Sequence, residues 1–382
     1  MADMRANSIR IITESQSPQG AYVACPNFSQ YRYCWLRDGS FIAYAMDRVG
    51  SHDSARLFHR WVDSVLLRKG GQVEKIADAL AGGSPPNSWD MLPTRYRLDG
   101  LDENDDWPNF QLDGYGTWLW GLSEHLDRTG DMSLLADLQE SIGIVLRYLA
   151  LCWRMPSYDC WEEFGDRLHP STLACLYGGL TAINRYLGRK DLAQLAGTIH
   201  DYILTCGVVS GRFAKSIGNS SVDANLLWLS VPFGVVETTD PLMLSTVNEI
   251  EKRLLHRGVH RYPEDTYYGG GEWLLLACWL GWYYCRVNRA EAALPIKKWV
   301  ESCATDQGEL PEQINTHLNH PEYLSEWEKR WGAVATPLLW SHAMYLVLLE
   351  ELSEVIQVAI QPAALSISLS DPIPLAHLAT PW

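Results

Sequence analysis

The chain has 382 residues, of which 47% are hydrophobic and 20% are charged. That balance is typical of a globular protein and excludes a disordered one, and the length corresponds to two or three domains of ordinary size. The formal net charge of −15 disfavours nucleic acid, because phosphate binding requires clustered Lys and Arg. It also disfavours an anionic membrane surface. We therefore expect neither nucleic acid nor a membrane as a partner.

Two features of the sequence indicate the compartment: no targeting segment is recognisable, and the cysteines are not spaced as in disulfide or metal motifs. No stretch reaches the ~18–20 apolar residues that span a bilayer, since the longest, 273–285, ends at Arg286. Residues 1–20 contain no apolar segment typical of a signal peptide. The nine cysteines are an odd number and none has CxxC spacing, which predicts reduced, buried thiols. These features favour a cytoplasmic protein.

The apolar pattern is helical along most of the chain, with almost no strand-like alternation. In the stretch 54–67, Leu57, Phe58 and Trp61 fall on one stripe, which is typical of an amphipathic surface helix. Residues 273–284 are apolar all round and predict a helix buried on every side. In chain order, the expected helices span 2–15, 38–49, 51–69, 113–128, 131–152, 169–187, 189–206, 221–230, 240–256, 270–289, 290–304 and 331–352.

The two kinds of helix alternate, and the alternation predicts the architecture. Six amphipathic helices would form an outer ring around six more apolar ones, giving an all-α toroid of six helical hairpins. An open helical solenoid would show the same alternation and stays an alternative. We expect a single catalytic domain over 1–352. The remainder, 353–382, has no Lys or Arg and is expected to be an extended tail.

The connections from outer to inner helices are long, and long loops are where function is usually found. In a toroid they would all lie at one end. Five of them carry carboxylates, Arg or aromatic residues, which can hydrogen-bond sugar hydroxyls and stack on a pyranose ring. The five motifs are Tyr31-Arg-Tyr-Cys-Trp-Leu-Arg-Asp38, Trp107-Pro-Asn-Phe-Gln-Leu-Asp113, Tyr158-Asp-Cys-Trp-Glu-Glu163, Arg261-Tyr-Pro-Glu-Asp-Thr-Tyr267 and Pro311-Glu-Gln313.

These motifs, in this order, resemble the glucoamylase family of glycosidases (glycoside hydrolase family fifteen). The run from Arg261 to Tyr267, followed by Trp273, is the most specific element of the resemblance, which covers nearly all of residues 8–350. The family's fold is an (α/α)6 barrel. Its members are inverting exo-acting α-glucosidases that need no cofactor. The resemblance therefore implies that fold, that activity and a small oligosaccharide as substrate.

The resemblance assigns roles to two carboxylates. Glu162 matches the general acid and Glu312 the general base, while Glu163 matches a residue on the side of the leaving sugar. The chemistry suits the residue type, because breaking an acetal bond with inversion needs one protonated and one ionised carboxyl group ~6.5–9.5 Å apart. An apolar wall such as Trp161 would raise the pKa of the acid. Glu309, Glu322 and Glu326 are the alternatives for the base.

Substrate binding is also assigned by the match. Arg37 and Asp38 match the pair that holds the non-reducing glucose, although a helix-capping ion pair is the alternative. Arg261 matches an arginine across the cleavage point. Other matched positions line or flank the family's pocket: Tyr31, Trp35, Trp107, Gln111, Asp113, Trp161, Tyr267 and Trp273.

The chain also departs from the family. It lacks the N-terminal β-sandwich of many bacterial members and any starch-binding module. We therefore expect short α-glucosides as substrates, with isomaltose slightly preferred over maltose. A trehalase-type member and a non-catalytic sugar- or protein-binding toroid are the alternatives. No oligomeric state is predicted.

The sequence predicts no metal site. Asp102-x-Asn104-x-Asp106 resembles the start of an EF-hand loop, but Trp107 replaces the required Gly and Asp113 the required Glu. A solvated acidic loop is the better interpretation. His317 and His320 are not in a zinc-protease pattern. We expect no metal and no cofactor.

Overall fold

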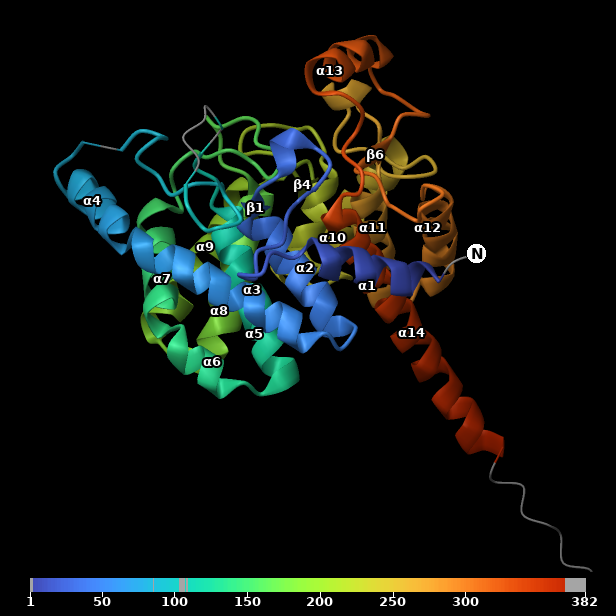
Figure 1. Cartoon of the computed structure of the whole chain (residues 1–382), viewed down its shortest axis with the longest axis horizontal. Helices are drawn as coiled ribbons and strands as arrows, with labels where there is room; N and C mark the ends of the chain where they lie inside the picture. Colours follow the sequence, from blue (N-terminus) through green and yellow to red (C-terminus); the bar gives the residue numbers. More distant parts are fainter. Residues whose placement is uncertain (1–2, 85, 103–106, 108, 368–382) are drawn as a thin grey trace, which may run out of the picture.

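A computed structural model describes residues 3–84, 86–102, 107 and 109–367. Six elements form an inner ring, all but η3 labelled in Figure 1: α2 (Leu36–Arg48), α5 (Asp113–Thr129), α8 (Pro170–Leu187), η3 (Ala224–Leu229), α11 (Leu274–Arg286) and α14 (Leu339–Ile367). Each of these packs against the next, and α14 packs against α2, so the ring closes. The predicted toroid is therefore confirmed, and the open solenoid is excluded.

An outer element packs against each inner one, as the alternation predicts. The outer elements are α1 (Met4–Ser15), α3 (His52–Leu66), α7 (Gln139–Cys152), α9 (Lys190–Cys206), α10 (Pro241–Arg253) and α12 (Ala290–Ser302). In α3, Phe58, Trp61 and Val62 face inward and are buried. In α11 every residue from Leu274 to Cys285 is buried, because the helix is surrounded on all sides.

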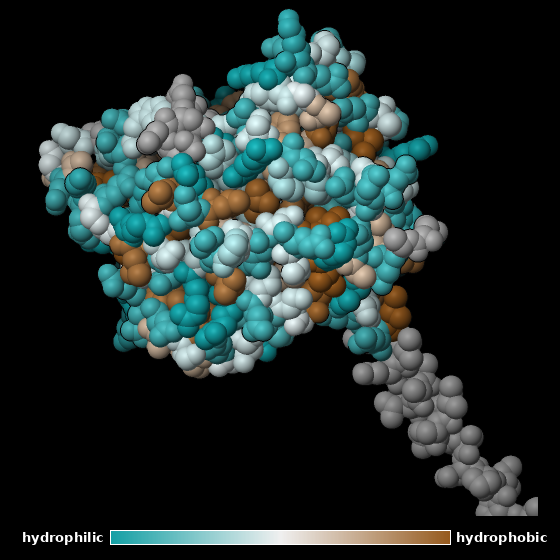
Figure 2. Space-filling model, viewed as in Figure 1, coloured by the Kyte–Doolittle hydropathy of each residue, from teal (hydrophilic) through white to brown (hydrophobic). Residues whose placement is uncertain are grey.

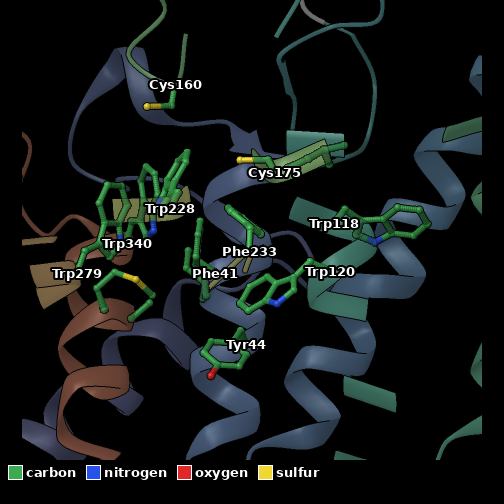
Figure 3. Packing of buried hydrophobic residues seen from close by; sticks show 14 of the residues in the cluster. Phe41, Tyr44, Trp118, Trp120, Cys160, Cys175, Trp228, Phe233, Trp279 and Trp340 are labelled. Atoms are coloured by element: carbon green, nitrogen blue, oxygen red, sulfur yellow. The ribbon is translucent and has the colours of Figure 1, made fainter. Parts of the chain in front are cut away.

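The barrel axis is filled by aromatic side chains. Phe41 stacks on Trp228 with ring centroids 5.7 Å apart and on Trp340 at 5.6 Å, so α2, η3 and α14 meet there (Figure 3). Trp279 of α11 lies 4.8 Å from Trp228. Such offset and tilted ring contacts bury a large apolar area. They close the interior, so that any cavity at the mouth has a solid floor.

Close backbone approach also fixes the inner ring. A Cβ atom at Gly116 of α5 would lie 2.5 Å from the carbonyl oxygen of Cys175 in α8. A Cβ atom at Gly179 would lie 2.2 Å from the carbonyl oxygen of Gly116. Only glycine permits α5 and α8 to pack at this distance.

Three two-stranded antiparallel ladders pin the loops at the mouth. They pair β1 (Cys34–Trp35) with β2 (Arg95–Tyr96), β3 (Val208–Val209) with β4 (Arg212–Phe213), and β5 (Glu272–Trp273) with β6 (Gln313–Ile314). Trp35 lies opposite Arg95, and Trp273 opposite Gln313. Four short 3₁₀ helices complete the connections: η1 (Ser29–Tyr31), η2 (Leu67–Lys69), η4 (Tyr267–Gly269) and η5 (Pro321–Tyr323).

Several expectations about the helices were wrong. The connections 70–112 and 305–330 are not free of helix, because they contain α4 (Gly70–Ala81) and α13 (Leu324–Trp331). The expected helix 131–152 is split at Leu138 into α6 (Met132–Asp137) and α7. The expected inner helix 221–230 is the short 3₁₀ helix η3. Pro232 and Gly234 follow it closely, and neither residue favours continuation of a helix.

The expected extended tail is also wrong over its first part. α14 continues to Ile367 and projects away from the barrel (Figure 1). Between Leu339 and Gln361 the sequence contains no Gly or Pro, so nothing in it ends the helix at residue 352. Residues 368–382 lie outside the described part of the chain.

The outer surface shown in Figure 2 is mainly hydrophilic or neutral, with small hydrophobic patches between. Within the described residues, no helix has both the length and the apolar character that crossing a membrane requires. All nine cysteines are free, and seven of them are buried. The EF-hand-like run falls partly on residues 103–106, which lie outside the description. Asp102, which is described, pairs with Lys69.

Candidate active site

A cavity of about 360 Å³ opens at the end of the barrel where the long loops gather. Its volume is at the lower end of the ~300–1,000 Å³ range of small-molecule sites. It is lined by Ala24, Tyr31, Trp35, Arg37, Asp38, Trp107, Cys160, Trp161, Glu162, Glu163, Arg261, Tyr267, Trp273, Glu312, Trp327, Arg330, Trp331, Leu338 and Trp340. The five sequence motifs therefore come together at one mouth, as predicted.

The floor of the pocket is charged. Arg37 and Asp38 lie in the first turn of α2, with the Arg37 Nε and Asp38 Oδ1 atoms 3.2 Å apart. Arg37 also donates to Gln111 at 2.8 Å and to Asp113 at 3.1 Å. Gln111 and Asp113 hold the guanidinium from behind and do not line the cavity. Arg37 lies over the Trp340 ring, 5.3 Å from its centroid.

Burial of the Asp38 carboxyl raises its pKa to about 6, and Arg37 opposes the rise. Asp38 Oδ1 accepts no hydrogen bond of good geometry from any described residue. A buried carboxylate and a buried guanidinium side by side at the end of a pocket can bind two neighbouring hydroxyl groups. The helix-capping alternative for this pair is disfavoured, since the N-cap residue of α2 is Trp35 and both Arg37 and Asp38 line the cavity.

Glu162 sits on a sharp turn that its neighbours hold in place. Its backbone has a φ of 68°, a left-handed conformation that is uncommon outside glycine and is often found at functional sites. The Asp159 carboxylate accepts hydrogen bonds from the backbone N–H groups of Trp161 and Glu163, both at 3.0 Å. These bonds fix the turn on both sides of Glu162.

A buried ion network supports that turn. Lys215 Nζ lies 3.2 Å from Asp159 Oδ2 and also pairs with Asp223. Asp223 in turn accepts a hydrogen bond from the Trp161 indole at 3.0 Å. All three charged side chains are almost fully buried. The position of Glu162 is thus determined by groups that lie behind the pocket wall.

The carboxyl group of Glu162 accepts a hydrogen bond from the indole Nε1 of Trp35. Burial raises the pKa of Glu162 to about 7, while Arg37 and the Trp35 bond oppose the rise. Desolvation thus dominates the pKa shift of Glu162, as expected for a carboxyl group next to the aromatic ring of Trp161. A carboxyl group with this pKa is partly protonated at neutral pH and can donate a proton.

Glu312 lies directly before β6, and the β5–β6 ladder fixes its backbone next to Trp273. It is 2% exposed. Burial raises its pKa to about 8, and the hydroxyls of Tyr31 and Tyr267 and the Arg261 guanidinium oppose the rise. Its Oε2 atom has no hydrogen-bond partner among the described residues. The two pKa values alone do not decide which carboxyl is the acid.

Arg261 joins the wall near Glu162. Its Nε donates to Asp265 at 2.8 Å, and its Nη2 donates to Glu163 at 3.2 Å. The Tyr262 hydroxyl also donates to Glu163. The Glu163 carboxylate is therefore bound by Arg261 and Tyr262. Of the two adjacent carboxyl groups, only that of Glu162 forms no ion pair within the described residues.

The structure separates the rival carboxylates from the site. Glu309, Glu322 and Glu326 do not line the cavity. The carboxylates that do are Asp38, Glu162, Glu163 and Glu312, and of these Asp38 and Glu163 are ion-paired. Glu162 and Glu312 are thus the two pocket carboxyl groups that form no ion pair within the described chain.

Sequence reasoning missed some lining residues. Trp340 follows the last motif and sits in a run that reads as helix core. Trp327 and Arg330 belong to α13, where a loop was expected, and Trp331, which was expected to begin the last inner helix, is the last residue of α13. The signal was present, because Leu324, Trp327 and Trp331 recur at the spacing of one helix face.

The model of the family described as glycosyl hydrolases family 15 matches residues 2–350. The chain is 42% identical over 361 residues to the isomaltose glucohydrolase of Kribbella flavida, and the match covers 92% of each protein. A trehalase of Sulfolobus acidocaldarius is 23% identical, over 73% of this chain and 53% of the trehalase.

Solved structures agree with the sequence matches. A wild-type glycosidase that is 42% identical superposes with a TM-score of 0.88, covering 92% of this chain and 96% of the other. A bacterial glucoamylase in complex with acarbose has a TM-score of 0.73 at 21% identity, covering 92% of this chain and 55% of that one. At that identity the second likeness concerns the fold alone.

Proposed function

Because the chain belongs to glycosyl hydrolases family 15 and is an exo-α-glucosidase, we propose that it releases β-glucose, with inversion, from the non-reducing end of isomaltose and similar short α-glucosides. One observation carries the proposal. Two buried carboxyl groups, those of Glu162 and Glu312, lie in the same pocket, and neither forms an ion pair within the described residues. Such a pair is what inverting hydrolysis of a glycoside requires.

In this proposal Glu162 protonates the glycosidic oxygen and Glu312 activates the attacking water. The order is favoured by the surroundings. Glu162 is continuous with Glu163 and Arg261, the wall assigned to the leaving sugar. Glu312 adjoins the hydroxyls of Tyr31 and Tyr267, which can orient a water as donors and acceptors. The two carboxyl groups are required to stand ~6.5–9.5 Å apart in an inverting enzyme, and this spacing stays a prediction.

The floor of the pocket accounts for exo action. Arg37 and Asp38 end the cavity, and Trp340 with Phe41 fills the barrel beneath them. A glucan chain cannot pass through such a floor, so only a chain end can reach the carboxyl groups. The Arg37–Asp38 pair would bind hydroxyls of the terminal glucose.

The choice of substrate rests on similarity and on size. The 42% identical relative is an isomaltose glucohydrolase, and the match extends over nearly all of both proteins. The trehalase of Sulfolobus acidocaldarius matches at only 23% identity and over half its length. The cavity of about 360 Å³ suits a small sugar. Isomaltose is therefore preferred over maltose, and both over trehalose.

We also propose that the protein works in the cytoplasm. The nine cysteines are all free, and seven are buried, a pattern that suits a reducing compartment.

The test is hydrolysis of isomaltose, maltose and trehalose followed by proton NMR in the first minutes. We expect β-glucose to appear first, with the highest kcat/KM for isomaltose. Initial release of α-glucose would overturn the inverting assignment. Specificity constants that rise with chain length up to starch would overturn the proposed substrate size.

A further inference from the structure

In sequence, the helix α13 follows the loop of Glu312 and precedes α14. It lies above β6 in the view of Figure 1 and contributes to the lining of the pocket. It presents three side chains to the cavity, Trp327, Arg330 and Trp331. Both tryptophans are half-buried. The opposite face of the helix is exposed and hydrophilic, as the top of Figure 2 shows.

Trp331 connects this helix to the other side of the mouth. Its ring lies nearly parallel to that of Trp107, with centroids 6.4 Å apart and planes at 24°. It also contacts Tyr267, with ring centroids 6.1 Å apart. The Arg95 guanidinium also lies over the Trp107 ring, 3.6 Å from its centroid. Trp331 thus meets a ring that is itself held in place.

A series of ring contacts connects α13 to the proposed acid. Trp35 donates to the carboxyl group of Glu162, the ring of Trp107 lies 6.0 Å from that of Trp35, and the ring of Trp331 contacts that of Trp107. The floor formed by Arg37 and Asp38 belongs to the glucose that is released. This series of contacts connects Trp331 to the proposed acid Glu162, whose wall is assigned to the leaving sugar.

Arg330 offers a further hydrogen-bond donor at the mouth, next to Trp331. Its guanidinium lies over the Trp331 ring, 5.0 Å from the centroid, and over Trp327 at 5.3 Å. It forms no ion pair with a carboxylate of the described residues, although it is exposed at the mouth. A guanidinium beside a ring face offers hydrogen bonds to sugar hydroxyls while the ring offers stacking.

We propose that α13 forms the outer wall of the leaving-sugar subsite, with Trp331 packing on that sugar, Arg330 donating to its hydroxyls, and the Trp331–Trp107 pair ending the site after it. The inference rests on the proposed exo-α-glucosidase function and specifies which residues limit its substrate to a disaccharide. Without this wall, the leaving sugar would be contacted only from the side of Glu163 and Arg261.

The test compares three substrates: α-glucosyl fluoride, which has no leaving sugar, isomaltose and isomaltotriose. For Trp331→Ala, we expect kcat/KM for isomaltose to fall about tenfold, which is the range of one lost aromatic contact. The value for the fluoride should stay within about twofold, and the isomaltotriose-to-isomaltose ratio should rise. Arg330→Gln should raise KM for isomaltose and leave the fluoride unchanged. Trp331→Phe should restore most of the loss.

Lys329→Gln is the matched control, because Lys329 is exposed on the same helix and does not line the cavity; its constants should equal those of the wild type. Equal losses on the fluoride and isomaltose for Trp331→Ala would overturn the proposal, and so would unchanged ratios. If the wild type prefers another disaccharide, only the substrate proposal fails. The same comparison is then made with that disaccharide.

Discussion

The hydroxyl oxygens of Tyr31 and Tyr267 lie 2.9 Å apart and join two loops separated by 236 residues of sequence. Both hydroxyls adjoin Glu312 and oppose the rise in its pKa that burial causes. The pair thus favours the ionised form of the carboxyl group proposed as the base. It also ties η1, in front of the Arg37–Asp38 floor, to η4, which leads into the β5–β6 ladder.

Removing one hydroxyl should shift the acidic side of the activity profile. In Tyr267→Phe, Glu312 loses a donor that lowers its pKa, so its pKa rises. Because the base must be ionised, the acidic limb of kcat/KM against pH should move to higher pH. Activity on that limb should fall about fivefold, since a hydrogen bond contributes about 1 kcal/mol. An acidic limb that stays at the wild-type pH would contradict the role given to this pair.

The two carboxyl groups should respond differently to the leaving group. Glu162→Gln and Glu312→Gln should each lower turnover of isomaltose by ~10²–10⁴, the usual contribution of a general acid or base. An aryl α-glucoside with a good leaving group should partly rescue Glu162→Gln, because little protonation is needed. It should not rescue Glu312→Gln. Circular dichroism serves as the control for folding, and rescue of Glu312→Gln alone would reverse the two assignments.

The raised pKa of Glu312 also has a consequence for stability. In the folded protein its pKa is about 8, against the ordinary value of 4.5, so between these two pH values the folded state keeps a proton that the unfolded state has lost. The free energy of unfolding therefore falls as pH rises from about 4.5 to 8, and the loss is complete above 8. Above that range the ionised, buried carboxylate destabilises the fold.

Replacing this carboxyl group by a neutral one should remove the penalty. We expect Glu312→Gln to raise the free energy of unfolding by about 1–4 kcal/mol at pH 8 and to leave it nearly unchanged at pH 4.5. Urea unfolding at the two pH values measures both effects. The exposed Glu322→Gln serves as the control and should change neither. A stabilisation of equal size at both pH values would show that packing, rather than ionisation, is responsible.

Much of the fold could be predicted from local pattern. The run from Trp273 to Cys285 is apolar on every face, and such a helix has to lie inside the ring. Residues 224–229 are also buried and mostly apolar, but they form a 3₁₀ helix because Pro232 and Gly234 follow closely. α13 was missed for the opposite reason, since its three apolar residues are surrounded by charged ones. Its stability depends on rings that the rest of the chain brings to it.

The site could be predicted where the motif residue itself touches the cavity, as Arg261 and Glu312 do. Site contacts could not be predicted where they depend on the pairing of segments that are far apart in the sequence. Arg95 reaches Trp35 and Trp107 because β2 pairs with β1. Lys215 supports the turn of Glu162 from a separate loop, and nothing local to Lys215 indicates it.

The buried network behind the acid leads to the last prediction. Lys215 neutralises Asp159 and Asp223, and all three side chains are at most 4% exposed. In Lys215→Met two carboxylates would stay buried without a cation, which should destabilise the protein by about 3–5 kcal/mol and loosen the turn that carries Glu162. We expect lower kcat on isomaltose at a temperature where the variant is still folded.

Arg185→Met is the control, since Arg185 forms an exposed ion pair with Asp127 that should contribute about 0–1 kcal/mol. Urea unfolding and steady-state kinetics measure the two effects. Equal stability of the two variants would show that the network is not needed for folding, and an unchanged kcat in a destabilised Lys215→Met would show that it does not position the acid.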